Sequence, residues 1–169
     1  MTKKQFIQDE IWLLSTLGGF QRSNAYVVTS NENERKLFKD SLRKFIDENV
    51  LEFYDFKVPE IEHLKNILSI QEFTKKFDKL LVGGKLNFGI TQKVFNLYLK
   101  YLWCLELIEI PPHFPVDSII QGKLGIYNNP WTKFENAEPY IYAINIAKKK
   151  LEDSDFKSLA ELELILFKR

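Results

Sequence analysis

Hydrophobic residues dominate one stretch near the middle of the chain. Residues 93–108 contain no glycine or proline, and nearly all of them are apolar. The length and the lack of helix breakers predict a helix, and apolarity on almost every side predicts that it is buried. Apart from Glu106 near the end, the polar exceptions are Lys93, Asn96 and Lys100, whose spacing of i, i+3 and i+7 places them on one stripe.

This stripe has two interpretations. It can be the solvated face of an otherwise buried helix. Alternatively, Lys93 stands in the first turn of the helix, where the helix dipole disfavours a cation and the surrounding apolar residues desolvate it. Both effects lower the pKa of a lysine, and a lysine that is neutral part of the time can attack a carbon atom. The sequence leaves both interpretations open.

Apolar residues recur at helical intervals along the rest of the chain as well. Stop signals at glycines predict helices over residues 3–17, before Gly18-Gly19, and over residues 116–124, before Gly125. Capping boxes predict three helix starts, at Asn31 and Glu34, at Ser69 and Glu72 for a helix over residues 70–82, and at Ser158 and Glu161. Prolines predict two more helices, one after Pro59 and one from Pro139 to about residue 151. Residues 20–29 fit either a short strand or one turn of helix. We therefore expect one all-α domain over residues 1–169, with about seven or eight helices, short connections and a joint like a helix-hairpin-helix motif before the central helix.

Composition places the chain among ordinary globular proteins. Hydrophobic residues make up 45% and charged residues 28% of the sequence, which excludes a disordered chain. The single cysteine, Cys104, excludes an internal disulfide, and we expect a packed thiol in a reducing compartment. There is no long apolar run and no secretory signal at the start, so we expect a cytoplasmic protein without membrane contact. Two histidines and one cysteine do not reach the number of metal ligands without carboxylates, and no cofactor motif is present, so we expect no metal or other cofactor. The abundance of lysine, asparagine, isoleucine and phenylalanine suggests an AT-rich bacterial or phage gene.

Positive charge gathers in one region although the whole chain carries a formal charge of only +1. Residues 75–100 contain six lysines against one acid, Asp78, a local charge of +5. The lysines surround the glycines that join two predicted helices, where backbone N–H groups and a helix N-terminus suit a phosphate. The region fits either nucleic-acid contact or an ordinary lysine-coated surface.

Three short motifs follow one another in and after this region. They are Gly89-Ile90-Thr91-Gln92-Lys93-Val94, Phe114-Pro115-Val116-Asp117 and Leu124-Gly125. Together they resemble the helix-hairpin-helix (HhH-GPD) superfamily of DNA glycosylases over residues 89–125. Thr91 stands where the family has a second glycine, Asn87-Phe88 stands where it has Leu-Pro, and the spacing from Lys93 to Asp117 is longer than usual.

The resemblance implies a role for each matching residue. In bifunctional members of the family, the lysine at the position of Lys93 attacks the sugar C1′ as an amine, and the aspartate at the position of Asp117 caps a helix and assists departure of the base. Both roles are physically sound, because a desolvated lysine forms a Schiff base and an aspartate at a helix N-terminus stays ionised beside a developing positive sugar. DNA contacts are then expected at Lys85, Gly89, Thr91, Lys100 and His113.

Two functional hypotheses result. The first is a DNA-binding protein that flips a base out of the duplex and cuts its glycosidic bond with Lys93 and Asp117. The second is a non-catalytic helical module that binds nucleic acid or a protein partner, with Lys93 and Asp117 as surface and capping residues. An enzyme needs the amine and the carboxylate to face one cleft with apolar walls, whereas a module does not.

Other residues bear chemistry of lower specificity. His113 lies in a proline-rich loop beside Asp117, where it can serve as a general acid or base. His63 falls among acids in a predicted helix and is expected at the surface. Trp103 and Tyr101 are expected in the core, and Trp131 follows a turn from which it can be exposed or fold back onto the core.

Overall fold

Seven α-helices form the framework of residues 1–167, which are the residues that the computed structural model describes. They are α1 (Lys3–Phe20), α2 (Glu32–Asn49), α3 (Glu60–Phe73), α4 (Phe88–Cys104), α5 (Ser118–Leu124), α6 (Glu138–Glu152) and α7 (Leu159–Leu166). Four short 3-10 segments connect them: η1 (Leu51–Asp55), η2 (Thr74–Phe77), η3 (Val82–Gly84) and η4 (Trp131–Lys133). The prediction of an all-α chain with seven or eight helices is confirmed. Residues 20–29 form neither a strand nor a helix turn beyond α1, and Tyr26 pairs with Leu81 in an isolated bridge.

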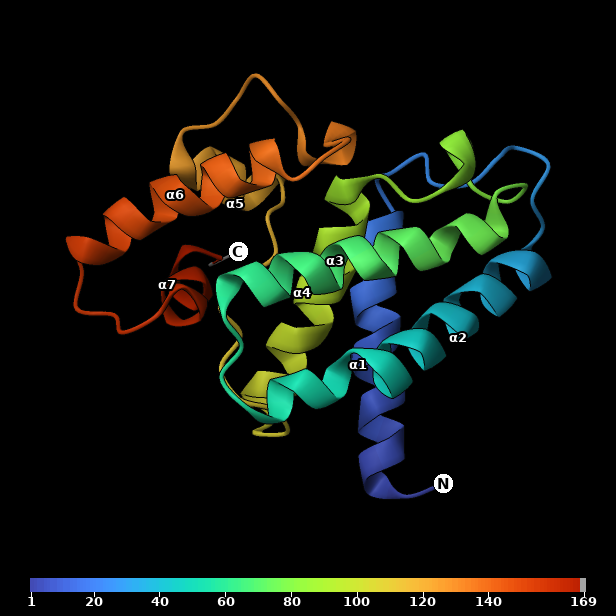
Figure 1. Ribbon diagram of the computed structural model, residues 1–169, viewed down its shortest axis with the longest axis horizontal. Helices are drawn as coiled ribbons and strands as arrows, with labels where there is room; N and C mark the ends of the chain where they lie inside the picture. Colours follow the sequence, from blue (N-terminus) through green and yellow to red (C-terminus); the bar gives the residue numbers. More distant parts are fainter. Residues whose placement is uncertain (168–169) are drawn as a thin grey trace.

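The central helix is α4, as the hydrophobic pattern predicts. Its neighbours include α1, which packs along it, and α3 (Figure 1). Figure 1 also shows α2 and α3 running across α1 and α4, while α5, α6 and α7 (orange to red) gather at the left of the view. One contiguous core of buried apolar side chains joins both groups of helices. None of the described helices combines the length and apolarity that a membrane span requires.

The contact between α1 and α4 depends on two glycines. Gly18 and Gly19 lie inside α1, which continues to Phe20, so the prediction that the helix ends at these glycines is wrong. A Cβ atom on Gly18 would overlap the side chain of Leu97, and one on Gly19 would overlap the side chain of Val94. The glycines therefore let the two helix backbones approach closely, and this brings the C-terminal end of α1 next to the middle of α4.

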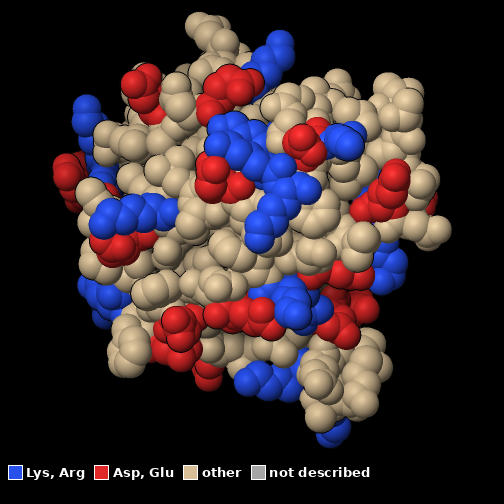
Figure 2. Space-filling model, turned by 45° about the vertical axis from the view of Figure 1, so that its right-hand side comes forward, with Lys and Arg blue, Asp and Glu red and all other residues tan. Residues whose placement is uncertain are grey.

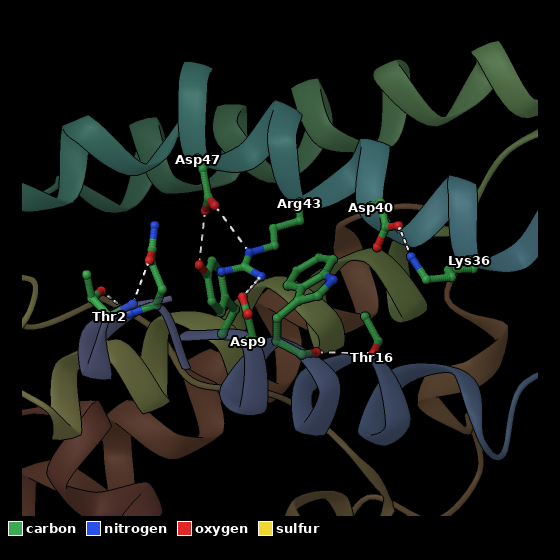
Figure 3. A network of polar contacts seen from close by, with 10 residues as sticks. Thr2, Asp9, Thr16, Lys36, Asp40, Arg43 and Asp47 are labelled. Atoms are coloured by element: carbon green, nitrogen blue, oxygen red, sulfur yellow. Dashed lines mark hydrogen bonds and ion pairs between the residues drawn. The ribbon is translucent and has the colours of Figure 1, made fainter. Parts of the chain in front are cut away.

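An ion-pair network fastens α1 to α2 at the surface. Arg43 on α2 contacts Asp9 on α1 at 2.5 Å and Asp47 at 3.4 Å (Figure 3). The hydroxyl of Tyr98 on α4 donates a hydrogen bond to Asp47 at 3.0 Å. Arg43 and Asp47 of α2 thus connect this helix to α1 and α4, and the several donors of the guanidinium group suit such a position.

Local capping signals give mixed results. Asn31 accepts a hydrogen bond from the backbone N–H of Glu34, and Ser158 accepts one from Glu161, so both capping boxes mark true helix starts. The capping box predicted at Ser69 is wrong, because α3 continues through it to Phe73 and the Ser69 hydroxyl bonds back to the Asn66 carbonyl. The predicted helix over residues 70–82 is consequently absent. Its second half is replaced by short 3-10 turns that lead to the two glycines of the joint, both with φ near +76°.

Two histidines lie in the core, side by side. The His63 and His113 rings meet edge to face with centroids 4.9 Å apart, and both side chains are buried, which corrects the expectation that His63 is at the surface. The hydroxyl of Tyr54 pairs with His63 Nδ1, and that of Tyr140 pairs with His113 Nδ1. Burial lowers the pKa of His63 well below its ordinary value and lowers the pKa of His113 to about 4, although Glu60 opposes the second shift.

We expect Gly19→Ala to lower the free energy of unfolding by about 1 to 3 kcal/mol, because the added methyl group would force α1 away from Val94. Gly122 in α5 offers a matched control, since a Cβ atom there would meet open space. Gly122→Ala should leave the stability unchanged or raise it slightly. Urea unfolding of both variants checks this, and equal stabilities would contradict the close contact.

We also expect stability to fall as the pH is lowered from about 6.5 to about 4, because the unfolded chain binds protons at its histidines over this range while the folded chain does not. His113 alone should contribute about 3 kcal/mol to this loss. Stability should be regained above pH 6.5, where both states hold neutral histidines. Urea unfolding of the wild type and of His113→Gln at a series of pH values checks this, and an equally steep loss in the variant would contradict it.

Candidate functional site

Lys93 and Asp117 meet at the boundary between α4 and α5. Asp117 precedes α5 as its N-cap, and its Oδ1 accepts a hydrogen bond from the backbone N–H of Ile120 at 2.9 Å, so its predicted capping position is confirmed. Its Oδ2 accepts a hydrogen bond from Lys93 Nζ at 2.5 Å. Only 4% of Lys93 and 8% of Asp117 is exposed. The amine and the carboxylate therefore form a largely buried ion pair, although 24 residues separate them in sequence.

Both side chains line one cleft, with a volume of about 560 Å³. Its apolar side chains come from α1, α4, the start of α5, η4 and the C-terminal end of the described chain: Leu14, Leu17, Leu97, Tyr101, Ile119, Trp131 and Phe167. Gln21 and Arg22, just beyond the end of α1, add polar groups from exposed positions. The amine and the carboxylate thus face one cleft, and apolar side chains form part of its wall.

Lys93, Asn96 and Lys100 are all buried, so the interpretation of this stripe as a solvated face is wrong. Each of the three has a partner on another element. Lys93 pairs with Asp117, the Asn96 amide donates to the Tyr140 hydroxyl at 3.0 Å, and Lys100 Nζ lies 2.6 Å from Glu163. The stripe faces helices that pack on α4 from later in the chain.

The pKa of Lys93 is lowered from its ordinary value. Burial, which disfavours the charged form, is the largest cause, and the nearby charge of Lys100 acts in the same direction. The carboxylates of Asp117 and Glu163 oppose the shift. Since α4 begins at Phe88, Lys93 lies in its second turn rather than the first, and burial replaces the helix dipole as the main reason for the lowered pKa.

Gln92 holds the segment before Asp117 in place. Its side-chain amide donates to the Val116 carbonyl at 2.7 Å, and its carbonyl oxygen accepts from the Val116 backbone N–H at 3.1 Å. This pair of hydrogen bonds fixes residue 116 against α4 and brings Asp117 within reach of Lys93. This positioning role of Gln92 was not predicted from the sequence. The only sign of it there is that Gln92 is a polar residue next to Lys93 at the start of an apolar helix.

Four of the five expected DNA contacts lie inside the protein. Thr91 bonds to the Asn87 carbonyl, Gly89 packs against the backbone at Trp131, Lys100 pairs with Glu163, and His113 contacts Tyr140. All four are buried, which corrects the expectation that they contact nucleic acid from the surface. Lys85 is half-buried and keeps a place at the surface. The beginning of α4 therefore serves packing rather than phosphate binding.

His113 does not join the pair of Lys93 and Asp117. Its Nδ1 lies 3.1 Å from the Tyr140 hydroxyl and its Nε2 lies 3.7 Å from Glu60, and the ring is not part of the cleft wall. Burial keeps it neutral at pH 7 by lowering its pKa to about 4. A role as general acid or base beside Asp117 does not fit this position.

The lysine-rich region is less positive at the surface than its sequence suggests. Lys93 and Lys100 are buried in ion pairs, and Lys75 pairs with Glu72 at 2.7 Å. On the face shown in Figure 2, lysine and arginine side chains alternate with aspartate and glutamate. That face has no broad field of one sign, and a nucleic-acid partner would have to be held by a few local contacts.

The structure also places four residues whose burial the sequence left to be tested. Cys104, at the last position of α4, is exposed rather than packed in the core. Trp131 folds back onto the core, whereas Tyr101 and Trp103 are half-buried. Of these residues, Trp131 and Tyr101 line the cleft beside Lys93.

Within residues 1–167, no three histidine, cysteine, aspartate or glutamate side chains are grouped so as to hold a metal ion. No protein-family model, curated protein or solved structure matches the chain. The function therefore has to be inferred from the cleft and from the ion pair that it contains.

We expect Asp117→Ala to lower the free energy of unfolding by about 3 to 5 kcal/mol, because it leaves the buried Lys93 amine without a counter-ion. Loss of an N-cap alone costs about 1 kcal/mol. Ser158→Ala at the N-cap of α7 is the matched control, since Ser158 makes a capping bond and no ion pair. Guanidinium unfolding compares the two variants, and a similar small loss in both would show that the ion pair adds little.

Proposed function

We propose that the protein acts on DNA in the manner of a helix-hairpin-helix glycosylase with lyase activity, with Lys93 as the amine nucleophile and Asp117 as the assisting carboxylate. The observation that carries the proposal is the buried contact of these two groups at the wall of an apolar cleft. The matching motifs in the sequence place the same two residues in these roles.

Chemistry at the pair follows from its electrostatics. The lowered pKa of Lys93 raises the fraction of neutral amine, and the Asp117 carboxylate accepts the proton that the amine gives up. The amine lone pair then forms a bond to the sugar C1′ while the glycosidic bond breaks. The base leaves with the bonding electrons and takes up the proton that Asp117 holds, so the carboxyl group becomes an anion again. One amine proton moves to the ring oxygen as the sugar ring opens, and this leaves a positively charged Schiff base that the Asp117 anion stabilises.

The cleft provides room and contacts for a flipped nucleotide. Its volume of about 560 Å³ falls within the range of sites for small ligands. Tyr101 and Trp131 offer aromatic surface in its wall, and Arg22 supplies a positive charge at an exposed position. A base must leave the duplex to reach Lys93 in such a recess. Arg22 would contact a DNA phosphate, because the residues at the start of α4 are buried and cannot do so.

A second function, a non-catalytic module that binds a protein partner, is favoured by one observation. Five large apolar side chains of α1 are between 40% and 49% exposed, namely Phe6, Ile7, Leu13, Leu14 and Leu17. A row of this kind on one helix is typical of an interaction surface. In that case the pair of Lys93 and Asp117 serves only to hold α5 against α4.

Borohydride trapping separates the two functions. The protein is incubated with duplexes that carry an abasic site or an oxidised purine, and is then reduced with borohydride. We expect a covalent protein–DNA band in the wild type and its loss in Lys93→Gln, because only an amine forms the Schiff base. Lys79→Gln, which removes an exposed lysine, is the matched control and should keep the band.

Circular dichroism and DNA binding of Lys93→Gln establish that the loss of the band reflects chemistry rather than unfolding. Absence of a band from the folded wild-type protein would contradict the glycosylase proposal and favour the protein-binding module. A band that persists in Lys93→Gln would show that another amine reacts.

A further inference from the structure

A second buried ion pair lies next to the first. Lys100 Nζ on α4 contacts Glu163 Oε2 on α7 at 2.6 Å, and only 1% of Glu163 is exposed. Both carboxylate oxygens of Glu163 are buried, and neither forms a hydrogen bond among the described residues, so the contact with Lys100 is an ion pair. Lys100 is the cation that faces this negative charge. Neither Lys100 nor Glu163 takes part in the reaction proposed at Lys93.

The two ion pairs share one environment. Lys93 and Lys100 are seven residues apart on α4, which corresponds to two turns and a rise of about 10.5 Å along one face. The aromatic ring of Phe167 lies against both amines, with its centroid 5.9 Å from Lys93 Nζ and 4.4 Å from Lys100 Nζ. With four charged groups in so small a buried volume, each lysine feels the charge of the other pair more strongly than it would in water.

We propose that Glu163 and Lys100 are positioning residues that set the protonation state of the Lys93 amine together with Asp117. The inference deepens the proposed function and rests on it for its catalytic meaning. It assigns a task to α7, which delivers Glu163 to the central helix from the end of the chain.

The sign of each effect follows from the charges that face Lys93. Asp117 and Glu163 favour its charged form, whereas Lys100 disfavours it, and Arg22 on the same cleft adds a positive charge at an exposed position. Removing the Glu163 charge leaves Lys100 uncompensated, so Lys93 should lose its proton more easily. Removing the Lys100 charge leaves Glu163 uncompensated, so Lys93 should hold its proton more firmly. An ion pair too distant or too well screened to act on Lys93 would give no such opposite pair of shifts.

The test uses the full chain and the variants Glu163→Gln and Lys100→Met, with Lys150→Met as a control on an exposed lysine of α6. Titration of ¹³C-labelled lysine side chains by NMR follows Lys93 without any DNA. The pH profile of borohydride trapping on an abasic duplex follows its reactivity. Glu163→Gln should move both midpoints to lower pH and raise the trapping rate at pH 7 by up to about tenfold. Lys100→Met should move both midpoints to higher pH, and Lys150→Met should move neither.

Either variant decides the matter alone if the other does not fold, because each predicts a shift of given sign. Unshifted Lys93 titration in a folded variant, or a shift of the wrong sign, would overturn the inference. Opposite NMR shifts without any trapping in the wild type would uphold the electrostatic coupling and refute the glycosylase proposal. Trapping that depends on Lys93 but keeps one pH profile in all variants would refute the coupling alone.

Discussion

The buried contact between the Lys93 amine and the Asp117 carboxylate is the interaction on which the candidate site depends. Removing two charges from water is costly, and in a protein interior their attraction repays that loss only with good geometry and further hydrogen bonds. Here Asp117 also caps α5, and a second ion pair lies beside the first. A pair of apolar residues could join α4 to α5 with less difficulty, so stability alone does not require charged groups at this position.

Several packing features exist to hold this pair at the cleft. Gly18 and Gly19 let α1 approach α4, so that the end of α1 forms one wall beside Lys93. Gln92 clamps Val116 and thereby places Asp117. Gly89 lets the backbone at Trp131 lie against the start of α4, which brings that residue into the opposite wall. The three glycines and Gln92 are uncharged, and their positioning role is seen only from their contacts in the folded chain.

Most helix starts that depend on neighbouring residues were predicted from the sequence, although the capping box at Ser69 does not start a helix. The caps at Asn31, Ser158 and Asp117 lie within one turn of the helices they start, and the burial of α4 follows from its own apolarity. Features that depend on distant partners were not predicted. Lys100 is buried because Glu163 arrives from α7, and two glycines read as a helix end became a helix contact because α4 lies opposite them. Capping chemistry is local, whereas burial of polar groups is decided by tertiary packing.

The proposal that the Lys93 amine reacts with DNA is tested most directly by mapping the residue that becomes joined to DNA. The borohydride-reduced complex with an abasic duplex would be digested, and the modified peptide sequenced by mass spectrometry. We expect the sugar remnant to be attached to the Nζ atom of Lys93. Attachment at the N-terminal amine or at an exposed lysine, with Lys93 unmodified, would contradict it.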